Sequence, residues 1–172
     1  MFKIGFFGGK MLPVHIGHVF CIKEAAKRCE ELHVLLFHSL SNEQSLIAKS
    51  VLPKKLLLPE VREWVLREEF KGKKNIFIHA INGSNCMSAE TLLNSDNFDN
   101  IKLVTEIIHK FPDVVFSSES SYSHFLKSIY PNTEHVIIDE KREHYPISGT
   151  LVRGLELDKA LKFLPEAYKK IL

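Results

Sequence analysis

Short apolar segments alternate with amphipathic segments along most of this chain, and that alternation restricts its fold more than any other feature. The first apolar segment, 2–7, is stopped by Gly8 and Gly9, and the apolar residues of 17–32 then recur three and four positions apart, as in a helix. The expected strands cover 2–7, 33–37, 75–81, 113–116 and 135–138, and the expected helices cover 17–32, 59–70, 101–111 and 122–129. This order predicts an α/β fold with a doubly wound parallel sheet of about five strands, in which ligands bind beyond the carboxyl ends of the strands.

The size and composition of the chain predict a globular protein with one domain over residues 1–172. It is 45% apolar and 26% charged, and its 23 basic and 21 acidic residues leave a net charge of +2. No basic face broad enough for nucleic acid is expected. No apolar stretch approaches the roughly 20 residues that span a bilayer, and no signal peptide is recognised, so a cytoplasmic protein without a membrane partner is expected. The oligomeric state is left open, with a homo-oligomer as one possibility.

The cysteines and the long polar stretches give further expectations. The three cysteines are odd in number and form no CxxC pair, which predicts neither a disulfide framework nor a cysteine-rich zinc site. The polar stretches 39–55 and 82–100 are longer than ordinary connections and are candidate substrate loops. The only tryptophan, Trp64, falls at a helical position and is expected in the core.

A glycine- and histidine-containing motif lies where the first strand turns into the first helix. Gly8 and Gly9 lack a Cβ, so a phosphate can approach the backbone there, and the following helix offers free N–H groups at its start. Lys10 adds a positive charge, and His15 and His18 stand one helical turn apart, where both rings can donate hydrogen bonds to a polyphosphate. The motif matches neither GxxxxGK[ST] nor GxGxxG, and an HxxH zinc site lacks further ligands at suitable spacing. The motif therefore favours a phosphate-binding turn.

A second motif, 147–153, follows the last expected strand and opens a short helix. Ser148 is typical of a helix N-cap. Thr150 and Arg153 are three residues apart, so a hydroxyl and a guanidinium share one helix face and can both meet phosphate oxygens. Alone, this pattern is also that of an ordinary capped helix; beside the first motif, it favours a second phosphate contact.

Together these motifs resemble a known superfamily. The segments 15–18 and 147–153 resemble the two signatures of the nucleotidyltransferase superfamily, whose fold is Rossmann-like. Segments 74–82, 116–120 and 136–142 are similar to the nicotinamide mononucleotide adenylyltransferase domain of bifunctional NAD-biosynthesis regulators, in order over nearly the whole chain. The resemblance implies an enzyme that joins AMP from ATP to nicotinamide mononucleotide, giving NAD and pyrophosphate. It also implies that Mg²⁺ is held mainly by the ATP phosphates.

The resemblance also implies the roles of individual residues. The expected ATP-binding residues are Gly8, Gly9, Lys10, His15, His18, Ser118, Glu119, Ser148, Thr150 and Arg153. The expected catalytic residues are Lys10, His15, His18 and Arg153, and the expected acceptor-binding residues are Phe7, Gly8, Asn82 and Arg142. Because the attacking group is the substrate phosphate, the protein contributes positioning and charge neutralisation.

The acceptor is less constrained than the AMP donor. The family usually has aromatic residues in the loop that holds nicotinamide, but none stands in 83–97, and Met11 and Leu12 also occupy positions where the family tends to have aromatic residues. Another phosphorylated acceptor, such as phosphopantetheine or glycerol phosphate, therefore stays open. So does a regulatory domain that senses ATP or NAD with little turnover, although the retained His15, His18 and Arg153 argue against it.

Overall fold

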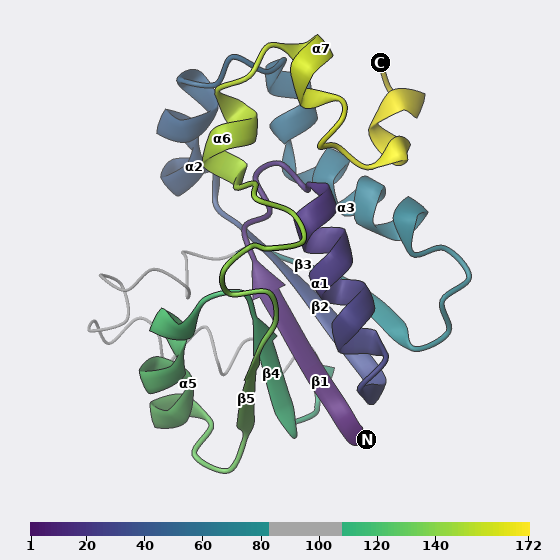
Figure 1. Ribbon diagram of the computed structural model, residues 1–172, viewed down its shortest axis with the longest axis vertical. Helices are drawn as coiled ribbons and strands as arrows, with labels where there is room; N and C mark the ends of the chain where they lie inside the picture. Colours follow the sequence, from purple (N-terminus) through teal and green to yellow (C-terminus); the bar gives the residue numbers. More distant parts are fainter. Residues whose placement is uncertain (83–107) are drawn as a thin grey trace.

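A computed structural model of the chain describes residues 1–82 and 108–172 and contains one sheet of parallel strands. The strands are β1 (Phe2–Gly9), β2 (Cys29–His38), β3 (Ile76–Asn82), β4 (Val114–Ser117) and β5 (Glu134–Ile137). Their order in the sheet is β3-β2-β1-β4-β5, and every neighbouring pair is parallel (Figure 1). The predicted α/β fold with five parallel strands is confirmed. The strands β2 and β3 are added on one side of β1, and β4 and β5 are added on its other side, so the switch point of the sheet lies at β1.

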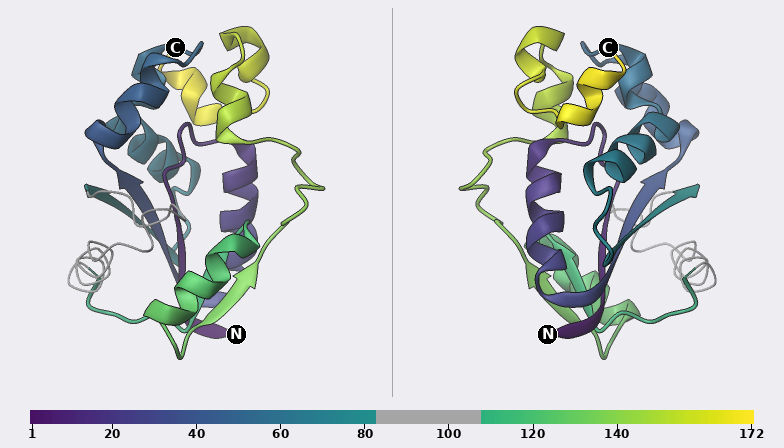
Figure 2. Two further views of the ribbon diagram at one scale, coloured as in Figure 1. Left: turned by 90° about the vertical axis from the view of Figure 1, so that its left-hand side faces the viewer. Right: turned by 90° about the vertical axis from the view of Figure 1, so that its right-hand side faces the viewer.

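Helical segments connect these strands and continue beyond β5. The α-helices are α1 (Ile16–Ala26), α2 (Leu40–Ala48), α3 (Pro59–Glu69), α5 (Ser123–Ile129), α6 (Gly149–Arg153) and α7 (Leu157–Ala160). The 3₁₀ helices are η1 (Lys54–Leu57), η3 (Ser120–Tyr122) and η4 (Glu166–Lys170). In Figure 2, α6, α7 and the C-terminus lie at the opposite end of the molecule from the N-terminus, beyond the carboxyl ends of the strands.

Each face of the sheet carries its own apolar core. Successive residues of a strand point to opposite faces, so Phe7 and Val34 contribute to one core while Phe6 and Leu35 contribute to the other. The first core also contains buried residues of α1 and α3, and the second contains Leu126 of α5. Strands covered on both faces are apolar along most of their length, which is why the sequence predicted them as short apolar segments.

The boundary between the first helix and the second strand differs from the prediction. The helix was expected over 17–32, but α1 ends at Ala26 and β2 already begins at Cys29. Cys29 pairs with Phe2 at the start of β1, so the parallel ladder extends this strand toward the helix. The buried Cys29 fits a helical period as well as a strand, and strand pairing decided the outcome.

Two other expectations were wrong. The stretch 39–55 was a candidate substrate loop, but most of it is helical and forms α2 and the start of η1. The only fully buried residue of α2 is Glu43, and the apolar residues that pack against the core, Leu46 and Ile47, stand together near its end, so they form no helical stripe along its sequence. Trp64 was expected in the core but is 38% exposed, because α3 turns Arg62, Val65 and Leu66 inward instead.

Part of the prediction lies outside the described residues, namely most of the helix expected over 101–111 and nearly all of the stretch 82–100. In the part that the structure does describe, no helix is long and apolar enough to cross a membrane.

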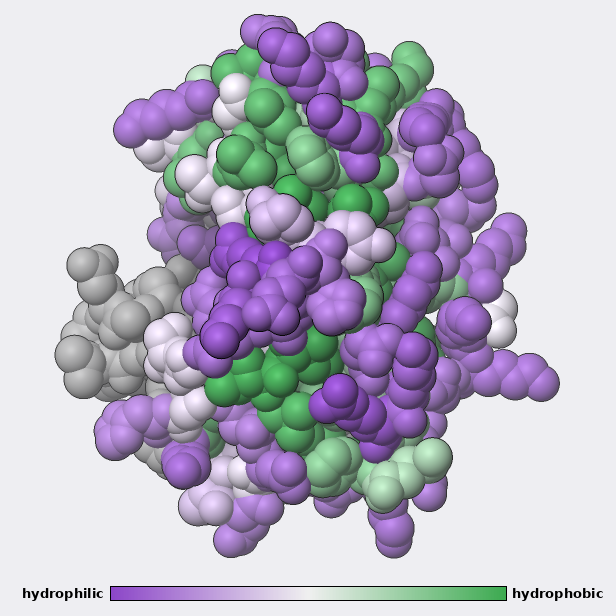
Figure 3. Space-filling model, in the orientation of Figure 1, coloured by the Kyte–Doolittle hydropathy of each residue, from purple (hydrophilic) through white to green (hydrophobic). Residues whose placement is uncertain are grey.

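Hydrophilic residues cover most of the face shown in Figure 3, and hydrophobic residues gather in its upper part, where Figure 1 places α6. Leu151 of α6 is 46% exposed.

Candidate functional site

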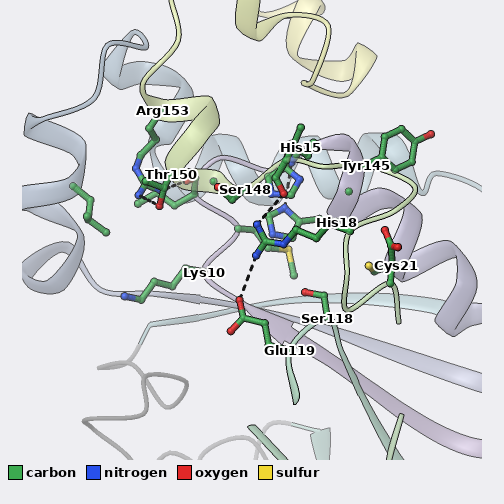
Figure 4. A pocket seen from close by; sticks show the side chains of 18 residues that line it. Lys10, His15, His18, Cys21, Ser118, Glu119, Tyr145, Ser148, Thr150 and Arg153 are labelled. Carbon is green, nitrogen blue, oxygen red and sulfur yellow. Dashed lines mark hydrogen bonds and ion pairs between the residues drawn. The ribbon is translucent and has the colours of Figure 1, made fainter. Parts of the chain in front are cut away.

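A cavity of about 300 Å³ lies beyond the carboxyl ends of β1, β4 and β5, where a doubly wound sheet is expected to bind its ligand. Its walls come from the segments that follow these strands and from the starts of α1 and α6 (Figure 4). The predicted site residues that line it are Lys10, His15, His18, Ser118, Glu119, Arg142, Ser148, Thr150 and Arg153. Residues from motifs more than 100 positions apart in the sequence therefore meet in one cavity.

The two histidines of the first motif are packed against each other at the start of α1. His15 is the N-cap, and its ring stacks on that of His18 with centroids 3.7 Å apart. The backbone N–H of His15 donates to Nδ1 of His18 over 3.2 Å. A Cβ on Gly17 would lie 3.1 Å from Nδ1 of His15, so a glycine gives this ring its room. The motif thus fixes both rings before any ligand binds.

The surroundings of both histidines favour the neutral imidazole. Burial lowers the pKa of His15 to about 4, and the positive charge of Arg142 acts in the same direction. Burial also lowers the pKa of His18 well below its usual value, with further contributions from His15 and Arg142. A neutral imidazole carries one N–H group. Because Nδ1 of His18 accepts a hydrogen bond, the proton of this ring belongs on Nε2, which is its available donor.

Hydrogen bonds join the second motif to the first. Ser148 is the N-cap of α6, and its hydroxyl accepts from the backbone N–H of Leu151 over 3.1 Å. Nη1 of Arg153 donates to the carbonyl oxygen of Leu12, and Nη2 donates to Oγ1 of Thr150 over 3.2 Å. A Cβ on Gly149 would lie 2.8 Å from the same carbonyl oxygen of Leu12. The shared face expected for Thr150 and Arg153 is present, and it lies against the turn of the first motif.

Arg142 and Glu119 both line the cavity and form an ion pair there. Nη2 of Arg142 lies 3.5 Å from Oε1 of Glu119, and Nη1 donates to the carbonyl oxygen of Ile147 over 3.1 Å. Arg142 has a φ of 53°. Figure 4 shows this ion pair as the dashed line that reaches Glu119 from the centre of the cavity. A guanidinium therefore stands close to both histidines and lowers the pKa of each.

A chain of hydrogen bonds holds the turn that carries Ser118 and Glu119. Nε2 of His135 lies 2.7 Å from Oγ of Ser117, and its Nδ1 lies 2.7 Å from Oγ of Ser123. The hydroxyl of Ser117 also contacts the backbone of Glu119, accepting from its N–H over 3.3 Å and donating to its carbonyl oxygen over 2.9 Å. The turn is therefore held by side chains of β4, β5 and α5 that the sequence did not single out.

Some predicted site residues lie away from this cavity or point out of it. Phe7, Gly8, Gly9 and Asn82 are not among its lining residues. Phe7 is buried in the core, and a Cβ on Gly8 would lie 3.0 Å from the ring of Phe37, so this glycine also serves packing within the sheet. Lys10 lines the cavity, but its amine points away from the histidines (Figure 4).

Further lining residues were not predicted as site residues, among them Cys21, Leu46, Asp139 and Tyr145. Asp139 has a φ of 52°, and its Oδ1 accepts from the backbone N–H groups of Glu143 and His144. These bonds shape the segment that brings Arg142 and Tyr145 to the cavity. The left-handed backbone of a non-glycine residue leaves little trace in one sequence, so Asp139 gave no signal.

Known proteins resemble this chain over most of its length. A family model described as cytidylyltransferase-like matches residues 6–155. The trifunctional NAD biosynthesis/regulator protein NadR of Escherichia coli (strain K12) is 29% identical over 153 residues, which cover 87% of this chain and 36% of that protein. The chain thus spans about a third of the length of this relative.

Two solved structures share the fold. A NadR protein in complex with NAD and AMP-PNP superposes with a TM-score of 0.66 at 20% identity, covering 99% of this chain and 46% of that one. A bifunctional NMN adenylyltransferase/ADP ribose pyrophosphatase from Francisella tularensis superposes with a TM-score of 0.61 at 13% identity, covering 89% of this chain and 41% of that one. At these identities the likeness establishes the fold.

Proposed function

The chain belongs to the cytidylyltransferase-like family of nucleotidyltransferases, and on that premise we propose that it transfers AMP from ATP to nicotinamide mononucleotide, giving NAD and pyrophosphate. The observation that carries the proposal is the meeting of both motifs in one cavity, with His15 and His18 on one side and Thr150 and Arg153 on another. The choice of acceptor is supported by the similarity to NadR over 87% of this chain.

The cavity offers hydrogen-bond donors to a polyphosphate. His18 contributes its Nε2–H group, and Arg153 and Arg142 contribute guanidinium groups. The hydroxyls of Ser118 and Thr150 add neutral donors. We infer that the ATP phosphates lie between α1 and α6, with the adenosine toward Ser118 and Glu119.

The proposed reaction proceeds without a covalent enzyme intermediate. A phosphate oxygen of the acceptor attacks the α-phosphorus of ATP, and the bond from this phosphorus to the oxygen bridging to the β-phosphorus breaks. Pyrophosphate leaves with that oxygen, and the new phosphoanhydride joins AMP to the acceptor. The histidine N–H groups suit this step because they donate hydrogen bonds to the developing charge and no proton has to move.

The residues of the cavity favour a metal ion that is carried by the substrate. Among residues 1–82 and 108–172, no group of three His, Cys, Asp or Glu side chains is arranged to hold a metal ion. The carboxylate of Asp139 already accepts hydrogen bonds from the segment 143–144, and Glu119 faces Arg142. We therefore propose that Mg²⁺ is held mainly by the ATP phosphates, where it neutralises charge on the leaving pyrophosphate.

A panel of acceptors tests this function. Purified protein is mixed with ATP, Mg²⁺ and one of nicotinamide mononucleotide, nicotinate mononucleotide, phosphopantetheine or glycerol 3-phosphate, and pyrophosphate release is measured. We expect release, together with NAD, from nicotinamide mononucleotide. Faster release with phosphopantetheine or glycerol 3-phosphate, and none with either mononucleotide, would reject the NAD assignment. Tight ATP binding without release from any acceptor would favour a nucleotide sensor.

A further inference from the structure

We propose that Arg62 and Glu43, which lie behind the candidate ATP site, are positioning residues that fix the backbone of the 10–12 turn for phosphate binding. The inference rests on the proposed binding of ATP in the cavity described above. Neither residue lines that cavity, and their exposed fractions are 0% and 1%. They can therefore act on a nucleotide only through the turn.

One buried guanidinium joins two helices to the turn. Arg62 of α3 makes two contacts with the carboxylate of Glu43 of α2, from Nη1 to Oε1 over 3.2 Å and from Nη2 to Oε2 over 2.5 Å. Nη1 also donates to the carbonyl oxygen of Lys10 over 2.5 Å. The carboxylate fixes the fork of Arg62, and the fork fixes the orientation of the peptide that follows Lys10.

The turn itself needs such support. Met11, between Lys10 and Leu12, has a φ of 47°, in the left-handed region that is unfavourable for a residue with a Cβ. The carbonyl before Met11 accepts from Arg62, and the carbonyl of Leu12 after it accepts from Arg153. Two guanidinium groups therefore hold the Lys10–Met11 peptide, directly before the strained residue, and the Leu12–Pro13 peptide, one residue after it. Met11 and its two neighbours all line the cavity, so a rotation of either peptide changes the surface that meets the phosphates.

Stability alone does not account for a charged pair at this place. Burying a carboxylate and a guanidinium costs desolvation energy that their attraction often only balances, and apolar side chains of similar volume commonly serve a core as well. Nε of Arg62 is buried without a hydrogen-bond partner in the described part of the chain, which adds to that cost. The contribution that apolar side chains cannot replace is the hydrogen bond to Lys10.

The test replaces the pair by apolar residues and compares it with a matched control on the same helix. The variant is Glu43→Leu/Arg62→Met. The control is Glu63→Gln/Arg67→Met, because Arg67 of α3 also pairs with a glutamate, at 2.8 Å, and also donates to a backbone carbonyl, that of Ile78, at 3.0 Å. The control thus removes an ion pair and a bond to a backbone carbonyl from the exposed side of the same helix, without touching the turn. Calorimetric titrations with Mg·ATP and with adenosine, and thermal unfolding, are measured on the full chain.

We expect the apolar double variant to unfold within a few degrees of the wild type and to bind Mg·ATP about 10–100-fold more weakly. That loss corresponds to one or two misplaced charge-assisted hydrogen bonds to phosphate. Its affinity for adenosine, which has no phosphates, should stay within about twofold, and the control should bind both ligands as the wild type does. A second variant, Arg62→Lys, keeps the charge beside Glu43 but replaces the fork by a point charge, and it should show the same selective loss of affinity for Mg·ATP. It replaces the double variant in the test if the double variant does not fold.

Several results would overturn the inference. A folded double variant, or a folded Arg62→Lys protein, with wild-type affinity for Mg·ATP would show that the turn needs no anchor. Equal losses for ATP and adenosine, or an equal loss in the control, would indicate general disruption. These outcomes are distinct from failure of the proposed function, in which the wild-type protein itself binds no Mg·ATP and this inference falls with it.

Discussion

His18 has two roles in this structure, and three substitutions separate them. Its Nδ1 accepts the backbone N–H of His15 at the start of α1, and its Nε2–H is the donor left for a phosphate. An alanine removes both groups. An asparagine keeps an acceptor near the place of Nδ1, and a glutamine keeps an amide N–H near the place of Nε2.

The two roles have different magnitudes. Removing one preorganised donor to developing charge costs about 10²–10³-fold in turnover, or about 3–4 kcal/mol of transition-state stabilisation. Leaving a helix-start N–H without its acceptor costs about 1 kcal/mol of folding free energy. His18→Ala should show both losses. His18→Asn should lose turnover while keeping its stability, and His18→Gln should stay within about tenfold of wild-type turnover while losing about 1 kcal/mol of stability.

Steady-state turnover and urea unfolding, measured on the same preparations, give these two quantities. Turnover is followed as pyrophosphate release with saturating ATP and acceptor. Wild-type turnover in His18→Ala would refute the assignment of Nε2–H to the reaction. Asparagine and glutamine variants with equal turnover would show that the ring shape matters and the position of its donor does not.

Three further predictions concern pH, the second motif and the acceptor. Because the folded protein lowers the pKa of His15 to about 4 from 6.5, the unfolded chain binds more protons between these values, so stability is full above pH 6.5 and falls as the pH drops toward 4. His15 should lower the free energy of unfolding by about 2 kcal/mol between pH 8 and pH 5, and urea unfolding of His15→Asn should not show this pH-dependent loss. A His15→Asn protein with the pH dependence of the wild type would contradict the assigned burial effect. Arg153→Lys should weaken ATP binding about tenfold in calorimetry, since a point charge cannot serve Leu12, Thr150 and a phosphate at once, and a wild-type dissociation constant would make the residue only part of a helix cap. Because 83–97 contains no aromatic residue to stack on the ring, the Michaelis constant for nicotinamide mononucleotide should be about tenfold higher than in enzymes that stack it, while that for ATP is ordinary. Nicotinate mononucleotide should be a poorer substrate than nicotinamide mononucleotide, and initial rates that favour the nicotinate form would disprove this.

The sequence predicted the features that depend on local pattern. Periodicity predicted the apolar strands such as β1 and β4. The residue types at the start of a helix predicted the N-cap at Ser148, and the glycines, histidines and arginine of the two motifs indicated phosphate binding. The all-parallel order of the sheet follows from the alternation of strands and helices.

What the sequence did not predict depends on contacts between distant residues. Glu43 is the only fully buried residue of helix α2, and its charged partner Arg62 lies on another helix, so no apolar periodicity indicates this contact. The contact of Arg153 with the carbonyl of Leu12 joins two motifs across 141 positions. Similarly, His135 supports Glu119 through the hydroxyl of Ser117, and each of these residues alone looks like an ordinary polar residue.

The fate of the α-phosphorus of ATP tests the proposed function most directly. The protein is incubated with Mg²⁺, nicotinamide mononucleotide and ATP that is radiolabelled at the α-phosphorus, and the products are separated. We predict that the label appears in NAD, in an amount equal to the pyrophosphate released, and that both products are lost together in His18→Ala. Label that stays in ATP, or that is released as free AMP while no NAD forms, would contradict the proposal that this cavity transfers AMP to nicotinamide mononucleotide.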